Sequence, residues 1–162
     1  MSEPPSNTIN TRDPEINEYY KEKAWIDMLN LNSLIYEYWK DEKVVGFSTA
    51  SMSKLRESLE GPPMGRPSLL LGRLGVDQAY TSQSLGEELT HYIIGLARKL
   101  KQKVGCRLVI LDVEKIQDEK SGELIENEKL ISNYVKLGFD KAKHQRREVT
   151  ILYFDLKNHP LL

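Results

Sequence analysis

The stretch RLGVDQAYTSQSLGEEL, residues 73–89, joins two segments of different character. Residues 68–76 are rich in leucine, which is typical of a strand buried on both faces. Residues 84–103 carry an amphipathic apolar stripe that predicts a long helix, with Gly105 just beyond as its terminator. Because the first turn of a helix has free N–H groups at the positive end of the dipole, we expect an anion site at this junction. A ligand with phosphate groups is its natural occupant.

The flanking sequence predicts an α/β (α+β) fold with a single mixed, mostly antiparallel sheet and helices on both faces. The crossover through the long helix makes the strands before and after it parallel. The domain itself is expected at 14–157, after a flexible leader at 1–13 and before a tail at 158–162. The other expected elements are a helix at 14–30, a hairpin of strands at 34–39 and 44–52 with its turn at 41–42, a surface loop at 53–67, a strand at 107–113, a polar insertion at 114–127, a helix at 128–136 and a strand at 148–156.

Composition restricts the class of protein. The chain has 162 residues, 40% of them hydrophobic and 29% charged, as in ordinary globular domains. No apolar run reaches the roughly 20 residues that span a bilayer, and the start of the chain lacks the pattern of a secretory signal. Cys106 is the only cysteine, so a cytoplasmic location is expected. Because it stands at the start of the apolar run 104–113 with no local base that could activate the thiol, a buried structural role is expected in preference to a nucleophile. The three histidines lie far apart, and we expect no metal site.

The junction resembles the acetyl-CoA signature of the GNAT acetyltransferases, which runs Arg or Gln, two residues, Gly, one residue, then Gly or Ala. Thr81 stands at the first of these places, Ser84 at the first glycine and Gly86 at the last, so two of the three positions depart from the pattern. Acetyl-CoA is the co-substrate that the resemblance implies. The implied cofactor-binding residues at the junction are Leu74, Gly75, Val76, Ser82, Gln83, Ser84, Leu85, Gly86 and Glu87.

A second segment resembles the same family independently. Asn127 and Asn133 precede Tyr134, and Gly138-Phe139 follows after three residues, in the order and spacing of the family's late helix. The resemblance implies that Tyr134 is the general acid that protonates the departing CoA thiolate, and that Asn127 and Asn133 bind CoA. A phenol with a pKa of about 10 suits a thiolate of similar basicity. Packing at a helix end is the alternative role for Tyr134.

Within the family, the chain is most similar to acetyltransferase toxins that modify the amino group of aminoacyl-tRNA. That branch implies aminoacyl-tRNA as a substrate and an antitoxin as a partner, and related enzymes often form homodimers. Basic clusters at 98–103 and 136–147 would be its phosphate contacts. The segments that carry this narrower resemblance are 23–24, 44–49, 73–77 and 104–107.

Three functions stay open at this point. The first is an acetyl-CoA-dependent N-acyltransferase in which a primary amine attacks the thioester directly and the backbone at 74–76 stabilises the oxyanion. The second is a toxin-like enzyme or binder of tRNA, and the third is a catalytically weak CoA-binding module. Glu37 and Asp112 are candidate bases acting through a water, without a pattern that singles out either.

Overall fold

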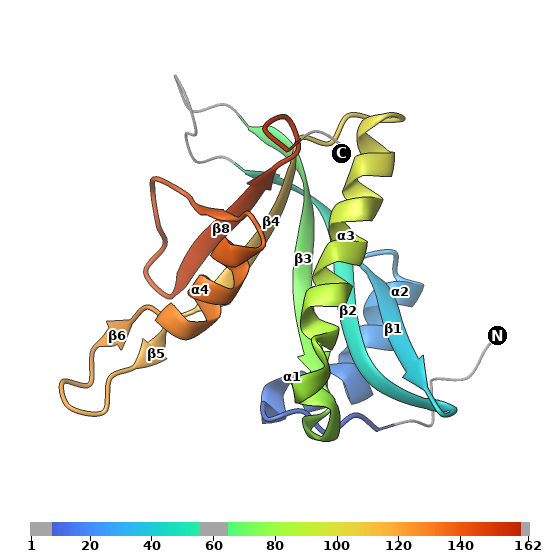
Figure 1. The fold of residues 1–162 in the computed structure, drawn as a ribbon, viewed down its shortest axis with the longest axis vertical. Coiled ribbons are helices and arrows are strands. Elements are labelled where there is room, and N and C mark those ends of the chain that lie inside the picture. Colours follow the sequence, from blue (N-terminus) through green and yellow to red (C-terminus); the bar gives the residue numbers. More distant parts are fainter. Residues whose placement is uncertain (1–7, 56–64, 160–162) are drawn as a thin grey trace. The chain divides into compact units, whose positions relative to one another are not determined.

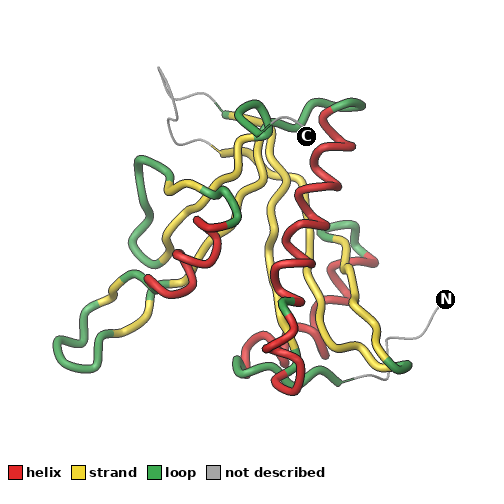
Figure 2. Tube along the Cα trace, in the orientation of Figure 1, coloured by secondary structure: helices red, strands yellow, loops and turns green. Residues whose placement is uncertain are grey.

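The computed structural model describes residues 8–55 and 65–159 (Figures 1 and 2). Its main sheet has the order β1-β2-β3-β4-β8-β7, and β5 pairs with β6 in a separate two-stranded sheet. The elements are α1 (Pro14–Glu18), the π-helical turn η1 (Tyr19–Lys23), α2 (Ala24–Leu29), β1 (Leu34–Lys40), β2 (Lys43–Leu55), β3 (Arg66–Val76), the 3-10 helix η2 (Gln78–Gln83), α3 (Leu85–Lys101), β4 (Leu108–Glu114), β5 (Ile116–Gln117), β6 (Leu124–Ile125), α4 (Glu128–Lys136), β7 (Asp140–Lys141) and β8 (Val149–Asp155).

This arrangement confirms the predicted mixed sheet. β3 pairs with β4 in parallel after the crossover through α3, whereas β1 with β2, β4 with β8 and β7 with β8 are antiparallel. The chain divides into two compact units, which are described in turn. The first unit contains residues up to 52 together with 71–96, and the second contains 53–70 together with the residues from 97 onward.

In the first unit, helices cover both faces of the strands. Adjacent residues of a strand point to opposite faces, and Phe47 packs against Tyr20 of η1, with 4.7 Å between ring centroids. On the other face, a Cβ at Gly46 would lie 3.2 Å from the side chain of Leu89 in α3. The run from α1 to α2 therefore covers the Phe47 face, and α3 covers the Gly46 face.

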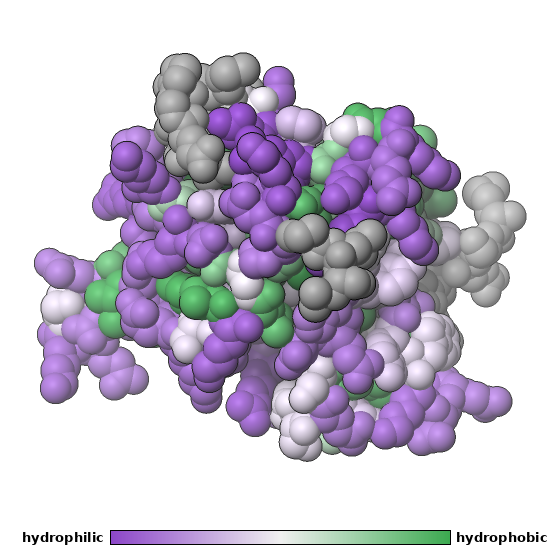
Figure 3. Space-filling model, turned by 45° about the horizontal axis from the view of Figure 1, so that its top comes forward, coloured by the Kyte–Doolittle hydropathy of each residue, from purple (hydrophilic) through white to green (hydrophobic). Residues whose placement is uncertain are grey.

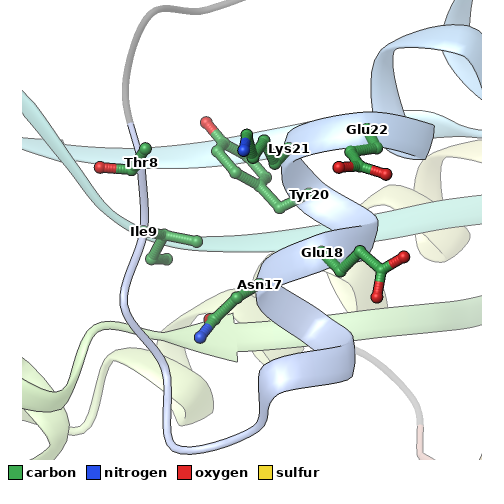
Figure 4. Close-up of a pocket in the computed structure, with 7 residues that line it drawn as sticks. All are labelled: Thr8, Ile9, Asn17, Glu18, Tyr20, Lys21 and Glu22. Atoms are coloured by element: carbon green, nitrogen blue, oxygen red, sulfur yellow. The ribbon is translucent and has the colours of Figure 1, made fainter.

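The start of the described chain is held against the first helix. Ile9 and Thr11 are buried, at 5% and 6% exposure. The Asn17 Oδ1 atom accepts hydrogen bonds from the Thr11 backbone N–H at 2.8 Å and from its hydroxyl at 2.7 Å. Figure 4 shows Thr8 and Ile9 running beside the helix that carries Asn17 and Tyr20, with a cavity of about 280 Å³ among these side chains. Residues 8–13 of the expected leader are thus part of the packed unit.

In the second unit, β4 and β8 pair along their whole length, from Leu108 opposite Asp155 to Glu114 opposite Val149. A chain of aromatic contacts joins α4 to β8: Tyr134 meets Phe139 edge-on at 5.6 Å, and Phe139 lies 5.6 Å from Phe154. One face of this sheet has its own apolar cluster. The buried members of that cluster are Leu55, Leu108, Ile110, Ala142 and Ile151.

Several predicted bounds were wrong. β2 and β3 extend into the predicted loop at 53–67 from both sides, and residues 56–64 of that loop lie outside the described residues. Pro67 lies near the start of β3, and its carbonyl accepts the N–H of Arg107 at 2.9 Å. The polar insertion at 114–127 contains the β5–β6 hairpin. The helix at 128–136 and the burial of Cys106 are confirmed.

Candidate functional site

The junction between β3 and α3 is fixed by a buried carboxylate in the first unit. Asp77, 5% exposed, follows β3 directly. Its side chain accepts hydrogen bonds from the Ala79 N–H at 3.0 Å and the Asn10 N–H at 3.2 Å, and Lys43 Nζ lies 3.8 Å away. Since its charge is shared among these groups, Asp77 serves to hold the turn into η2 and is not a free base.

Ser84 links η2 to α3 in a left-handed conformation, with φ 57° and ψ 21°. Only glycine adopts this region at no steric cost, so the backbone here has the geometry of a glycine position. The Ser84 carbonyl accepts the N–H of Glu88 at 3.1 Å, which starts the hydrogen bonding of α3. The first turn of α3, with its N–H groups at residues 85–87, lies beside the end of β3, since a Cβ at Gly86 would meet the side chains of Leu74 and Val76.

The surroundings of Gly75 and Gly86 in the candidate site differ. A Cβ at Gly75 would lie 2.8 Å from side-chain atoms of both Ile16 and Phe47, so packing within the first unit excludes a side chain there. A Cβ at Gly86 would meet only the side chain of Leu74 at 3.6 Å and that of Val76 at 3.9 Å, which is ordinary contact. Gly86 is thus free to serve a ligand, whereas Gly75 is needed by the fold.

Tyr134 lies on α4 in the second unit and is half-buried. Desolvation by burial raises the pKa of its phenol to about 12. A phenol with this pKa stays protonated throughout the physiological range and holds a proton that it can donate. At this pKa it is a weaker acid than an unperturbed tyrosine, whose pKa is about 10.

The two asparagines of the late helix differ in their surroundings. Asn127 is the N-cap of α4, where its Oδ1 accepts the Leu130 N–H at 3.2 Å. Asn133 is exposed on the same helix. An Asn just before an apolar-periodic segment is a common capping signal, so the role of Asn127 in ending the loop could have been predicted from sequence.

Neither candidate base gains support. Glu37 accepts a hydrogen bond from the Tyr20 hydroxyl at 2.5 Å on one carboxylate oxygen and from Trp39 Nε1 at 3.0 Å on the other. Asp112 is exposed on β4. A base role for Glu37 would require that two hydrogen bonds first be released.

The predicted site residues form two groups, one in each unit. The first group lies on consecutive elements of the first unit, and the second lies on or next to α4. They are Leu74, Gly75 and Val76 at the end of β3, Ser82 and Gln83 in η2, Ser84 in the link, Leu85, Gly86 and Glu87 in the first turn of α3, and Asn127, Asn133 and Tyr134 at α4.

Two further findings concern the described residues as a whole. Within 8–55 and 65–159, no three His, Cys, Asp or Glu side chains come together in a way that could hold a metal ion. None of the helices in these ranges is long and apolar enough to cross a membrane. Hydrophilic side chains cover most of the face seen in Figure 3, with smaller hydrophobic areas between them.

Comparison with known proteins places this geometry in context. A sequence model of the acetyltransferase (GNAT) family matches residues 5–139, which include both the junction and Tyr134. No curated protein matches the chain. Among solved structures, a bacterial toxin has a TM-score of 0.78 at 14% identity, covering 98% of this chain and 87% of the other.

Two structures of the toxin AtaT are also similar. AtaT in complex with acetyl-methionyl-tRNAfMet has a TM-score of 0.75 at 18% identity, covering 93% of this chain and 87% of the other. A tyrosine-to-phenylalanine mutant of AtaT, bound to the C-terminus of the antitoxin AtaR and acetyl-CoA, has a TM-score of 0.72 at 18% identity, covering 94% and 89%. At these identities the likeness establishes the fold.

Proposed function

The chain belongs to the acetyltransferase (GNAT) family, and from that premise we propose that it transfers an acetyl group from acetyl-CoA directly to a primary amine, with aminoacyl-tRNA as the acceptor. The observation that carries this proposal is the β3–η2–α3 junction. There, Ser84 has a left-handed backbone at the place of a family glycine, ahead of the first-turn N–H groups of α3. Such N–H groups suit the pyrophosphate of CoA.

In this proposal, the residues of the junction bind and orient the co-substrate. The N–H groups at 85–87 donate hydrogen bonds to phosphate oxygens. Gly86 allows the close approach, since a Cβ there would meet only ordinary contacts. The backbone at 74–76 pairs with the pantetheine arm as an added strand would. The same backbone stabilises the charge that develops on the thioester oxygen.

Tyr134 supplies the proton that the departing thiolate takes up. The support for this role is the match of the late helix to the family pattern. The phenol is half-buried and its pKa is raised to about 12, so it is protonated when the thiolate forms but is a weaker acid than an unperturbed tyrosine. The amine attacks the thioester carbon as the free base and the C–S bond breaks. The proton that the attacking nitrogen loses passes to water, and Tyr134 is reprotonated from water. No side chain of the described residues is assigned the task of deprotonating the amine.

The hydroxyl of Ser84 is proposed to donate to a phosphate oxygen of CoA. Ser84→Ala should then weaken acetyl-CoA binding about tenfold, because a hydrogen bond to a charged group is lost. Ser84→Gly should lose similar affinity while gaining about 0.5–1 kcal/mol in unfolding free energy, since glycine tolerates the left-handed backbone. Calorimetric titration and urea unfolding measure the two effects separately. If both variants keep the affinity of the parent protein, the Ser84 hydroxyl does not bind phosphate, and only backbone N–H groups do.

Aminoacyl-tRNA is proposed as the acceptor because two exposed basic clusters lie in the second unit and because AtaT, a structural neighbour, was solved with an acetylated aminoacyl-tRNA. An antitoxin partner is proposed on the same likeness, since AtaT also binds AtaR. The exposed lysines and arginines are Lys99, Lys101 and Lys103 of the first cluster and Lys136, Lys141, Lys143, Arg146 and Arg147 of the second.

Charge-removing variants test the tRNA surface. Lys143→Gln with Arg147→Gln should weaken the binding of all tRNAs, whatever their sequence. The slope of log K against log salt concentration should fall in magnitude by about 2, one for each phosphate that the variant no longer neutralises. The matched control is Lys120→Gln with Lys129→Gln, which removes the same charge from exposed positions outside both clusters. If both double variants weaken tRNA binding equally, the loss is due to net charge alone. That result would contradict a tRNA-binding surface at the second cluster.

Release of free thiol from acetyl-CoA tests the reaction itself. Pooled aminoacyl-tRNA should support release, whereas the same tRNA after deacylation should not, because it lacks the amine. Release with simple amines at equal concentration, but not with aminoacyl-tRNA, would show that aminoacyl-tRNA is not the acceptor. The proposal that the protein is an acetyltransferase would still hold. Absence of release with all acceptors, together with intact acetyl-CoA binding, would favour a CoA-binding module.

A further inference from the structure

A second cavity in the first unit contains none of the predicted cofactor-binding residues. Its volume is about 330 Å³, and it lies between β1 and α3. Its walls are three tyrosines, two glutamates and a leucine, with no lysine, arginine or histidine among them. The lining residues are Tyr36, Glu37 and Tyr38 of β1 and Glu88, Leu89 and Tyr92 of α3.

Strand geometry decides which groups face α3. Tyr36 and Tyr38 are alternate residues of β1, so their side chains lie on the same face. Glu37 lies between them and points to the opposite face, where Tyr20 and Trp39 occupy its two carboxylate oxygens. Glu88 is therefore the carboxylate that shares the cavity with the rings, and the Tyr38 hydroxyl hydrogen-bonds to it.

The rings of Tyr36 and Tyr92 are close together and inclined to one another. Tyr36 and Tyr92 have centroids 5.1 Å apart and planes inclined by 52°. Tyr92 is 56% exposed, so it lies outside the buried stripe of α3. Burial raises the pKa of Tyr36, and the hydrogen bond to Glu88 raises the pKa of Tyr38, so both phenols are neutral at physiological pH.

The neighbouring cations have partners elsewhere. Lys40 Nζ lies 2.8 Å from Gln83 Oε1 and 5.5 Å from the centroid of the Tyr80 ring. His91 pairs with Glu87 at 3.5 Å. The faces of neutral aromatic rings attract cations, most of all where the cation also carries apolar groups. We propose that this cavity binds an organic ammonium ion, with its charge beside Glu88 and its alkyl groups against Tyr36 and Tyr92.

Choline and its neutral isostere 3,3-dimethyl-1-butanol provide the test, on the full chain without acetyl-CoA. Saturable shifts of ¹³C-labelled tyrosine ring signals measure each affinity. Choline should bind about tenfold more tightly than the isostere, because only choline gains the electrostatic attraction of the rings and the carboxylate. Glu88→Gln and Tyr92→Leu should each weaken choline binding about fivefold or more. Both positions are exposed, so the variants are expected to fold.

Glu87→Gln is the matched control, because it removes the same charge one residue away on α3, outside the cavity. It should change choline affinity by less than about twofold. The proposal is overturned if choline shows no saturable binding, if the isostere binds equally well, or if Glu87→Gln weakens binding as much as Glu88→Gln. Since acetyl-CoA is absent, none of these results bears on the acetyltransferase reaction.

Discussion

Tyr134→Phe is expected to lower kcat by about 10²–10⁴-fold, the usual contribution of a positioned general acid, while the affinity for acetyl-CoA changes by less than about twofold. The substitution removes the hydroxyl and keeps the ring that packs edge-on against Phe139 at 5.6 Å. Folding should therefore be preserved. Steady-state thiol release and calorimetry separate the two quantities.

Tyr153→Phe is the control for this experiment, since it removes a phenol from another half-buried tyrosine of the second unit, on β8. Its activity should stay near that of the parent protein. If Tyr134→Phe also retains full kcat, the tyrosine packs at a helix end and the thiolate leaves without its help.

The pH dependence follows from the same group. Because burial raises the pKa of Tyr134 to about 12, the acid form persists well above neutrality, and no loss of kcat from this residue is expected up to about pH 11. The folded pKa lies above the unfolded value of about 10. Its contribution to stability is therefore complete below pH 10 and is lost as the pH rises toward 12. A fall of kcat with a midpoint near pH 8 that disappears in Tyr134→Phe would contradict this assignment.

Arg107→Leu is expected to lower the free energy of unfolding by about 3–5 kcal/mol, as when one partner of a buried ion pair is removed. Arg107 precedes β4 and donates from Nε and Nη2 to the two oxygens of Asp155, at 3.2 and 2.8 Å. Asp155 is only 4% exposed. In the variant its charge would stay buried without its main partner. Urea unfolding at neutral pH measures the loss.

Burial alone would raise the pKa of Asp155, but hydrogen bonds from Arg107 and the Lys157 N–H hold that pKa below its usual range. The pair therefore stabilises the protein above the unfolded pKa of about 3.9, and this contribution is lost as the pH falls through the folded value. Arg107→Leu with Asp155→Leu should recover most of the loss. Lys141→Gln, which breaks the more exposed pair with Glu126, should cost less than about 1 kcal/mol. A similar small cost for Arg107→Leu would mean that water reaches Asp155.

Local sequence patterns were sufficient for most of the fold. The apolar runs predicted the central strands, because side chains at 108–111 and 150–152 are buried whichever face they point to. The helix at 128–136 was predicted with both bounds. Gly138, with φ 101°, follows its end, and Asn127 caps its start, a signal that the prediction did not use. The strand, loop and helix of the junction were likewise predicted from residues close in sequence.

Features that depend on distant contacts were not predicted. The leader was expected to be flexible, yet Ile9 is buried in a cluster with Tyr20 and Phe47, which no local pattern reveals. Gly75 was assigned to the cofactor alone, whereas Ile16 and Phe47 exclude a side chain there. The left-handed backbone of Ser84 was also missed, because serine gives no signal for a conformation that glycine favours.

Calorimetric titration of the purified protein with acetyl-CoA tests the central claim most directly. The account predicts saturable binding at one site per chain, retained in Tyr134→Phe and weakened about tenfold in Ser84→Ala. Absence of binding at millimolar acetyl-CoA would contradict it, because neither the junction nor Tyr134 would then have a co-substrate on which to act.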